Sequence, residues 1–205
     1  MQVRKDLILR ELAHHAPFTL FGALTGLFLL LLTVNLVAGV GREFLFHLLH
    51  PLHLLLSATV TTAVYLKYER GRTEALAVGF AGSVGICTLS DIILPYLGGH
   101  LLGMPLRLHL CVVEHPWLVL PSTLAGVVLG MRRPTTVIPH SAHVLVSTYA
   151  STFYFTAFAS PASWIPLLPL LFPLLFVSVW LPCCTSDFIF PLLFVGREGA
   201  PLLKR

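Results

Sequence analysis

Long apolar stretches, separated by short polar segments, recur along the whole chain. Each stretch approaches the roughly 20 residues that a helix needs to cross a bilayer. The stretches that we interpret as membrane spans cover residues 17–40, 44–66, 74–97, 116–131, 138–159 and 164–195. This pattern predicts an all-α integral membrane protein with six transmembrane helices.

The sixth stretch is too long for one straight crossing, because a helix rises about 1.5 Å per residue. It contains Pro166, Pro169, Pro173, Pro182 and Pro191, and the third stretch contains Pro95. A proline inside a helix removes a backbone hydrogen bond and kinks or breaks the helix. We therefore expect kinked or broken third and sixth helices, with the end of the sixth re-entrant or lying along the interface.

The composition agrees with a membrane protein. Hydrophobic residues make up 56% of the 205-residue chain and charged residues only 11%. That charged fraction is less than half of the roughly 25% found in soluble domains. The basic residues lie in short clusters between apolar stretches. This distribution indicates the lipid bilayer as the surrounding partner and argues against a nucleic-acid partner.

The basic residues also predict the orientation. Residues 1–15 are charged and amphipathic, and we interpret them as an interfacial helix that leads into a retained span. Eleven of the thirteen Lys and Arg residues lie in this segment, in the 67–73 and 132–137 loops, or in the C-terminal tail. Six spans place all four segments on one side, and the positive-inside rule makes that side cytoplasmic. We predict a plasma or inner membrane location with both termini in the cytoplasm.

Two motifs occur twice, in the same order. The pattern H-x-x-H-x-L-x-S covers residues 50–57 in the second span and 140–147 in the fifth. The pattern C-x-x-S-D-x-I-x-P-x-L covers residues 87–97 in the third span and 183–193 in the sixth. The chain therefore contains an internal repeat of three spans.

An odd number of spans per repeat forces the second unit to enter the membrane in the opposite orientation. We predict two inverted-topology three-helix repeats, residues 16–106 and 107–205, that follow the interfacial segment within a single membrane domain. Inverted repeats are typical of alternating-access transporters. This architecture favours transport over catalysis.

The repeated polar residues are the candidate site. Ionisable groups inside a membrane cost at least about 2.5 kcal/mol each on insertion scales, so they are functional candidates. Candidate transport or proton-relay residues are Ser90, Asp91, Ser186 and Asp187. Candidate metal ligands are His15, His50, His53, Cys87, Asp91, Glu114, His115, His140, His143, Cys183 and Asp187. The topology predicts one His, Asp and Cys cluster near each membrane face.

Imidazole, carboxylate and thiol groups together suit a first-row ion such as Zn(II), Fe(II), Co(II), Ni(II) or Mn(II) better than Ca(II) or Mg(II). The leading hypothesis is a transporter of a divalent transition-metal cation. One alternative is a redox protein with two haems ligated by histidines, although H-x-x-H places both imidazoles on one helix face. Others are a proton-coupled carrier of a small organic solute and an intramembrane hydrolase, for which no H-E-x-x-H or G-x-S-x-G motif is found.

The remaining polar and small residues have simpler interpretations. His47, His100 and His109 have no counterpart in the other half, and we expect them at the membrane interface. Cys111 and Cys184 also lack counterparts. The glycines of the first, third and fourth spans allow close helix contact, either within the chain or in a homo-oligomer.

Overall fold

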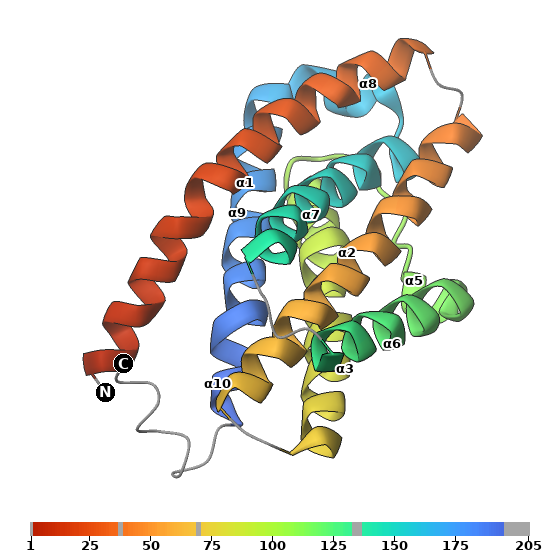
Figure 1. Cartoon of the computed structure of the whole chain (residues 1–205). Coiled ribbons are helices and arrows are strands. Elements are labelled where there is room, and N and C mark those ends of the chain that lie inside the picture. The colour runs from red at the N-terminus through yellow and green to blue at the C-terminus, as the bar shows by residue number, and fades with distance from the viewer. Residues whose placement is uncertain (1, 37–38, 69–70, 133–136, 195–205) are drawn as a thin grey trace.

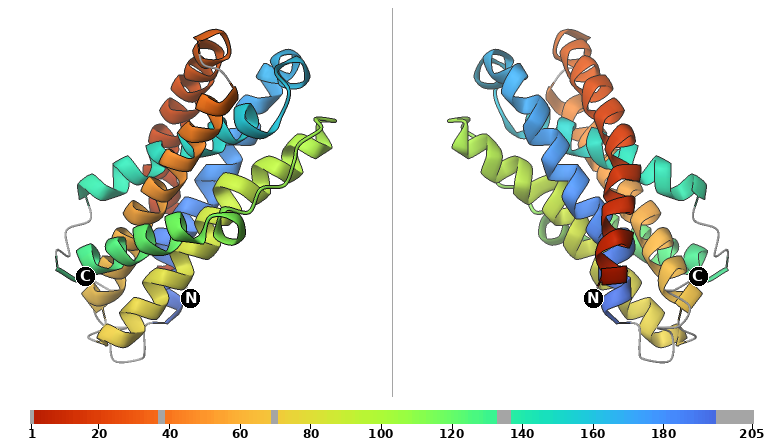
Figure 2. Two further views of the ribbon diagram at one scale, coloured as in Figure 1. Left: turned by 90° about the vertical axis from the view of Figure 1, so that its right-hand side faces the viewer. Right: turned by 90° about the vertical axis from the view of Figure 1, so that its left-hand side faces the viewer.

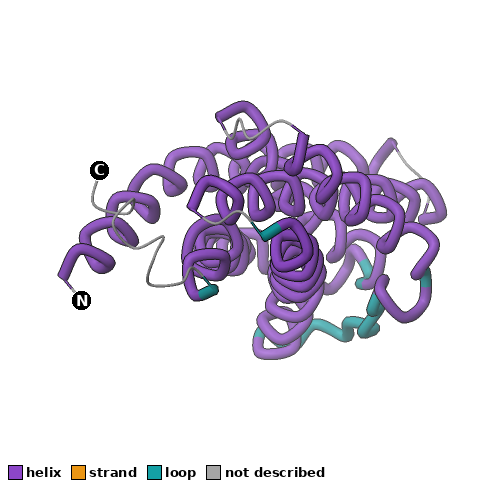
Figure 3. The backbone as a smooth tube through the Cα atoms, turned by 60° about the horizontal axis from the view of Figure 1, so that its bottom comes forward, coloured by secondary structure: helices purple, strands orange, loops and turns teal. Residues whose placement is uncertain are grey.

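The computed structural model describes residues 2–36, 39–68, 71–132 and 137–194, which form a bundle of helices (Figure 1). The longer helices are α1 (Gln2–Leu36), α2 (Gly39–Tyr68), α3 (Arg72–Thr88), α6 (Pro116–Arg132), α7 (Val137–Phe158) and α9 (Leu168–Cys184). The shorter ones are α4 (Leu94–Leu101), α5 (Cys111–Glu114), α8 (Pro161–Trp164) and α10 (Phe190–Leu193). No strand occurs in the described part of the chain (Figure 3), so the predicted all-α class is confirmed.

Four of the described helices are long and apolar enough to cross a membrane. They are His15–Thr33, Gly41–Tyr68, Arg72–Leu101 and Ile165–Cys183. The apolar helix Pro116–Arg132 is shorter, with 17 residues. The helix α7 is rich in serine and threonine and is not among the four. The structure therefore supports a membrane protein with at least these four spans.

The helices bury many polar side chains beside an apolar core and expose many large apolar side chains. Polar side chains that are buried include Thr19, His50, His53, Ser57, Asp91, Ser147 and Ser151. Large apolar side chains that are exposed include Phe21, Leu24, Phe28, Trp117, Leu124, Leu170 and Val177. Exposed apolar surface of this extent marks contact with an apolar surrounding, here lipid. The polar interior is the place to look for a site.

The helix α2 lies at the centre of the bundle and packs mainly against α7, α6 and α3 (Figure 2). The contact with α6 is close because Gly126 and Gly130 face the backbone of α2. Thr59 of α2 donates a hydrogen bond to the Gly126 carbonyl oxygen over 3.1 Å. On the other side, Gly22 and Gly26 of α1 lie against threonines of α7. These glycines are therefore used for packing within the chain.

We expect Gly126→Ala to destabilise the fold, because the new methyl group would overlap the backbone carbonyl of Leu55. Overpacking of this kind costs about 1–3 kcal/mol. Gly85 is a matched control, because a methyl group there meets nothing within 4 Å. Gly85→Ala should leave stability unchanged or raise it by up to about 1 kcal/mol through helix propensity. Thermal unfolding of both variants in one detergent tests this, and equal melting temperatures would contradict it.

The third and sixth predicted helices change their winding where a break was expected. A π-helical segment, η1 (Leu89–Ile93), joins α3 to α4, and a second, η3 (Thr185–Ile189), joins α9 to α10. A 3₁₀ segment, η2 (Ile165–Leu167), precedes α9. Each π segment lies just before the proline of the repeated motif, whose missing N–H leaves a carbonyl one turn earlier without its helical partner. The wider π turn keeps the chain helical, and such segments are frequent at functional sites.

The N-terminal segment is continuous with the first predicted span. Residues 2–15, expected as a separate interfacial helix, form the first part of the 35-residue helix α1. Pro17 lies inside this helix. The apolar part that could cross a membrane begins at His15.

Candidate functional site

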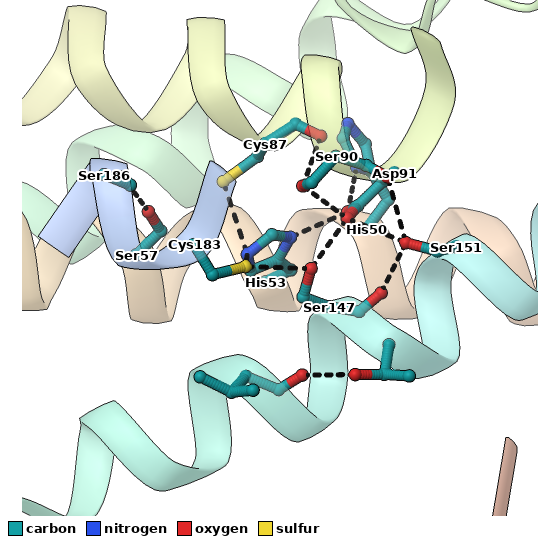
Figure 4. A network of polar contacts seen from close by, with 12 residues as sticks. His50, His53, Ser57, Cys87, Ser90, Asp91, Ser147, Ser151, Cys183 and Ser186 are labelled. Carbon is teal, nitrogen blue, oxygen red and sulfur yellow. Dashed lines mark hydrogen bonds and ion pairs between the residues drawn. The ribbon is translucent and has the colours of Figure 1, made fainter. Parts of the chain in front are cut away.

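A fully buried carboxylate lies at the centre of the polar interior. Asp91, in the π segment η1, is 0% exposed. Its Oδ2 atom lies 2.8 Å from Nδ1 of His50 and 2.7 Å from Nδ1 of His53, both on α2 (Figure 4). A carboxylate ion only accepts hydrogen bonds, so each Nδ1 carries the proton and each Nε2 presents a lone pair. The carboxylate thus fixes the tautomer of both imidazoles.

The second oxygen of Asp91 is occupied by hydroxyl groups. Oδ1 accepts hydrogen bonds from Ser90 at 2.9 Å and from Ser147 at 3.0 Å, with the Ser151 hydroxyl at 3.5 Å. Both carboxylate oxygens are therefore engaged by protein donors. In this arrangement Asp91 orients imidazoles, as the carboxylate behind a metal-binding histidine does, and is not itself placed as a ligand.

The Nε2 atom of His53 faces two sulfur atoms. It lies 3.6 Å from Sγ of Cys87 and 4.0 Å from Sγ of Cys183. The His143 ring is also adjacent, with its centroid 4.6 Å from that of His53. Donor atoms of His53, His143 and Cys183 all lie within 4.8 Å of one another. In a tetrahedral zinc site, bond lengths of about 2.0 and 2.3 Å separate a nitrogen and a sulfur ligand by about 3.6 Å. The 3.6 Å between His53 Nε2 and Cys87 Sγ matches that value, and the 4.0 Å to Cys183 Sγ is wider by a few tenths of an ångström.

We call this group, His53, His143, Cys87 and Cys183 with Asp91 and His50 behind them, the buried cluster. Its side chains are at most 1% exposed. Four helical elements contribute to it, namely α2, α3 with η1, α7 and α9. The Nε2 atom of His50 is buried and has no hydrogen-bond partner among the described residues. The buried cluster therefore combines nitrogen and sulfur donors in a site closed to solvent.

Hydroxyl groups tie the two π segments to the opposite helices. Ser151 of α7 donates to the backbone carbonyl of Ser90 at 3.1 Å. Thr61 of α2 donates to the backbone carbonyl of Ser186 at 3.3 Å, and the Ser57 and Ser186 hydroxyls are 3.1 Å apart. The backbone carbonyl oxygens of the candidates Ser90 and Ser186 therefore accept hydrogen bonds from hydroxyls of α7 and α2.

A second group of imidazoles lies one turn of α2 away. Nε2 of His47 and Nε2 of His109 are 2.9 Å apart, and donor atoms of His47, His109 and His115 all lie within 4.8 Å of one another. Glu114 Oε1 lies 2.9 Å from Nδ1 of His109. Burial lowers the pKa of His109, although the Glu114 carboxylate acts in the opposite direction. A neutral imidazole is the form that binds metal ions. We call these three histidines the peripheral triad.

The grouping of candidates differs from the expected one cluster near each membrane face. His143 and Cys183, from the second half, lie beside His53 of the first half. The reason is that α2 and α7 pack against each other, so that His53 of one H-x-x-H motif meets His143 of the other. Glu114 and His115 lie in the peripheral triad region, separate from His50 and His53.

Three further candidates lie elsewhere. His15 is buried in α1 and belongs to neither group of donor atoms among the described residues. The side chains of His140 and Asp187 fall outside the described part, although their backbones lie in α7 and η3. Of the residues set aside as interfacial, His47 and His109 join His115 in the peripheral triad. Neither has a counterpart in the other half, so the repeat could not reveal them. His100 is exposed and packs edge-on against Tyr96.

Not every buried thiol is a candidate ligand. Burial, helped by the carboxylates of Glu114 and Asp91, raises the pKa of the Cys111 thiol to about 12. Cys111 also belongs to neither group of donor atoms among the described residues. It packs in the apolar core.

Comparisons of the chain with protein-family models, with curated proteins and with solved structures find no match. The fold and the site alone define the class: a helical membrane protein whose interior holds a closed cluster of imidazole, thiol and carboxylate groups.

Proposed function

We propose that the chain transports a divalent transition-metal cation and that the buried cluster is its substrate site. One observation carries the proposal: nitrogen and sulfur donors of His53, His143 and Cys183 converge within 4.8 Å in the polar interior. Ionisable and soft ligands in such a position mark ion pathways in membrane proteins. Asp91 supports the site by orienting His53 from behind.

The types of donor atom narrow the choice of transported metal ion. Two imidazoles with the Cys183 thiol, and the Cys87 thiol 3.6 Å from His53 Nε2, favour Zn(II) or Co(II), because soft sulfur ligands disfavour the harder Mn(II). Thiols lose their protons when they bind a metal, so binding at Cys87 and Cys183 would release protons within the protein. Exchange of metal against protons follows from this chemistry as the coupling mode.

Equivalent hydrogen bonds support the inverted repeat within this proposal. Ser151 and Thr61 occupy matching positions in the two H-x-x-H helices, and Ser90 and Ser186 match in the two π segments. The bond from Ser151 to the Ser90 carbonyl at 3.1 Å therefore has a counterpart, from Thr61 to the Ser186 carbonyl at 3.3 Å. Contacts that recur in this way fit two related halves with the substrate site at their interface, as in alternating-access transporters.

The proposed topology has six spans in the plasma or inner membrane. They are the four long apolar helices together with α6 and α7. The start of α1, the end of α2 and the end of α10 lie at one end of the bundle (Figures 1 and 2). This arrangement agrees with an even number of crossings. The basic segments at that end make it the cytoplasmic side.

The geometry disfavours haem at the buried cluster. The His53 and His143 ring centroids are only 4.6 Å apart, with two thiols beside them. A porphyrin between axial histidines requires room for a flat macrocycle between the rings. The proton-coupled carrier of an organic solute remains the alternative, and metal analysis distinguishes it from a metal transporter.

Uptake of Zn(II) into liposomes that contain the purified chain and an internal metal-sensitive dye tests the proposal. We expect uptake well above that of protein-free liposomes. Cys183→Ser should weaken Zn(II) binding by at least the 10- to 100-fold that loss of an outer-shell contact causes, because a soft ligand is removed. Cys111→Ala, a change at a thiol outside the buried cluster, is the control. Uptake equal to that of empty liposomes, or unaffected by Cys183→Ser, would contradict the proposal.

A further inference from the structure

The peripheral triad gathers three imidazoles from separate parts of the chain. His47 comes from α2, His109 from the non-helical segment 102–110, and His115 from the junction of α5 and α6. The two Nε2 atoms of His47 and His109 are 2.9 Å apart. Bonds of about 2.0–2.1 Å in a tetrahedral site place two nitrogen ligands about 3.3 Å apart. A shift of a few tenths of an ångström would therefore admit a metal ion between these rings.

The Glu114 carboxylate contacts the triad at Nδ1 of His109, the ring nitrogen that does not face His47. Glu114 Oε1 lies 2.9 Å from Nδ1 of His109 and accepts a hydrogen bond from the Leu110 backbone N–H at 3.3 Å. The other oxygen of Glu114 lies 3.5 Å from the Arg107 guanidinium. Carboxylate behind imidazole is the usual support of a metal-binding histidine, because it directs the opposite nitrogen to the metal. In the buried cluster Asp91 makes such a hydrogen bond to Nδ1 of His53, whereas Glu114 lies at ion-pair distance from Nδ1 of His109 without hydrogen-bond geometry.

The segment that carries His109 is fixed in place. The Tyr154 hydroxyl donates to the Arg107 carbonyl at 2.9 Å and accepts from the His109 backbone N–H at 3.3 Å. The Phe158 ring stacks on the His109 ring, with centroids 4.5 Å apart and planes at 17°. Non-helical backbone within a membrane protein needs such internal partners. The position of His109 is therefore set by α7, as a preformed ligand requires.

The triad differs from the buried cluster in its access. His47 and His115 are only partly buried, and Glu114 is 40% exposed. An open surface pocket adjoins the triad and is lined by Glu43, Arg107, Ala157, Phe158 and Ala159. Glu43 lies one turn before His47 on α2, so the two side chains share a helix face. The triad is therefore partly accessible from outside, beside the Glu43 and Glu114 carboxylates and the Arg107 guanidinium.

We infer that His47, His109 and His115 form a second metal site, which binds a divalent first-row transition cation through three imidazoles and keeps one coordination position open. Three histidines with an open position suit Zn(II), Co(II) or Ni(II). Phe46 stacks on His50 and contacts His109, so one aromatic ring separates this site from the buried cluster. That the peripheral triad supplies metal ions to the buried cluster rests on the proposed function. Metal binding at the triad itself does not.

Zn(II) binding to the full-length chain in detergent, measured by calorimetry and by elemental analysis after gel filtration, tests the inference. His109→Ala and His115→Ala should each remove one Zn(II) per chain relative to the wild type. Glu114→Gln should keep that ion but weaken its binding about 10- to 100-fold. His100→Ala, which changes an exposed histidine outside both groups, should bind like the wild type.

The His53→Ala background separates this inference from the proposed function. If both sites exist, His53→Ala retains one Zn(II) and the double variant His53→Ala/His109→Ala retains none. If the buried cluster binds nothing, the wild type binds one Zn(II), which His109→Ala still removes, and the inference stands while the proposed function falls. Unchanged Zn(II) content and affinity in correctly folded His109→Ala and His115→Ala would overturn the inference.

Discussion

Asp91→Ala is expected to prevent the chain from accumulating as folded protein. The carboxylate satisfies Nδ1 of His50 and of His53 as well as the hydroxyls of Ser90 and Ser147, all of them buried. Removing it leaves these donors without an acceptor in an interior that water does not reach. Each buried donor left without an acceptor costs about 1–3 kcal/mol, and four donors lose theirs here. A change of that size lowers the ratio of folded to unfolded protein by a factor of about 100 or more.

Purified yield and thermal unfolding in detergent measure the effect. Glu74→Ala is the matched control, because Glu74 is an exposed carboxylate in the first turn of α3, the helix that leads to Asp91. Asp91→Asn should lie between the two, since an amide keeps one acceptor oxygen but adds an N–H group. A wild-type melting temperature for Asp91→Ala would show that the carboxylate is not the organising group described here.

His53→Ala is expected to abolish metal binding at the buried cluster and to reduce Zn(II) uptake to the level of empty liposomes. His53 touches Asp91, the Cys87 and Cys183 thiols and His143. Without His53, the Cys87 and Cys183 thiols and the His143 imidazole lose the donor nitrogen that lies beside all three. His50 still pairs with Asp91, so we expect the folded chain to persist.

Gel filtration and thermal unfolding verify that the His53→Ala chain is folded. Co(II) then serves as a spectroscopic probe, because thiolate ligation gives sulfur-to-cobalt charge-transfer absorption that should be present in the wild type and absent in the variant. His100→Ala provides the histidine control outside both groups. Folded His53→Ala with wild-type uptake and Co(II) absorption would refute the site.

The two π segments connect the sequence repeat to the chemistry. Each contains a Ser-Asp pair and lies between a cysteine and a proline of the same motif. A π turn rotates the following residues relative to an α-helix, which re-aims side chains at that point. In η1 this places Asp91 against α2 and α7 together. The π turn is thus the local feature that lets the Asp91 carboxylate contact residues of both α2 and α7.

The sequence by itself determined the helical membrane class, because apolar stretches of span length leave no soluble alternative at this charge content. It also singled out His53, Cys87, Asp91, His143 and Cys183, since a repeated polar motif within apolar helices has few structural explanations. Local spacing could place each cysteine near its own aspartate along one helix. It could not say which helices would face each other.

Only the tertiary structure decided how these residues group. The packing of α2 against α7 brings His53 and His143 from the two halves into one buried cluster, because glycines and hydroxyl residues allow those helices and their neighbours to approach closely. The same packing places the 102–110 segment against α7 and so builds the peripheral triad from His47, His109 and His115. Those three histidines share no periodicity, and contacts between distant segments leave no trace in a single sequence.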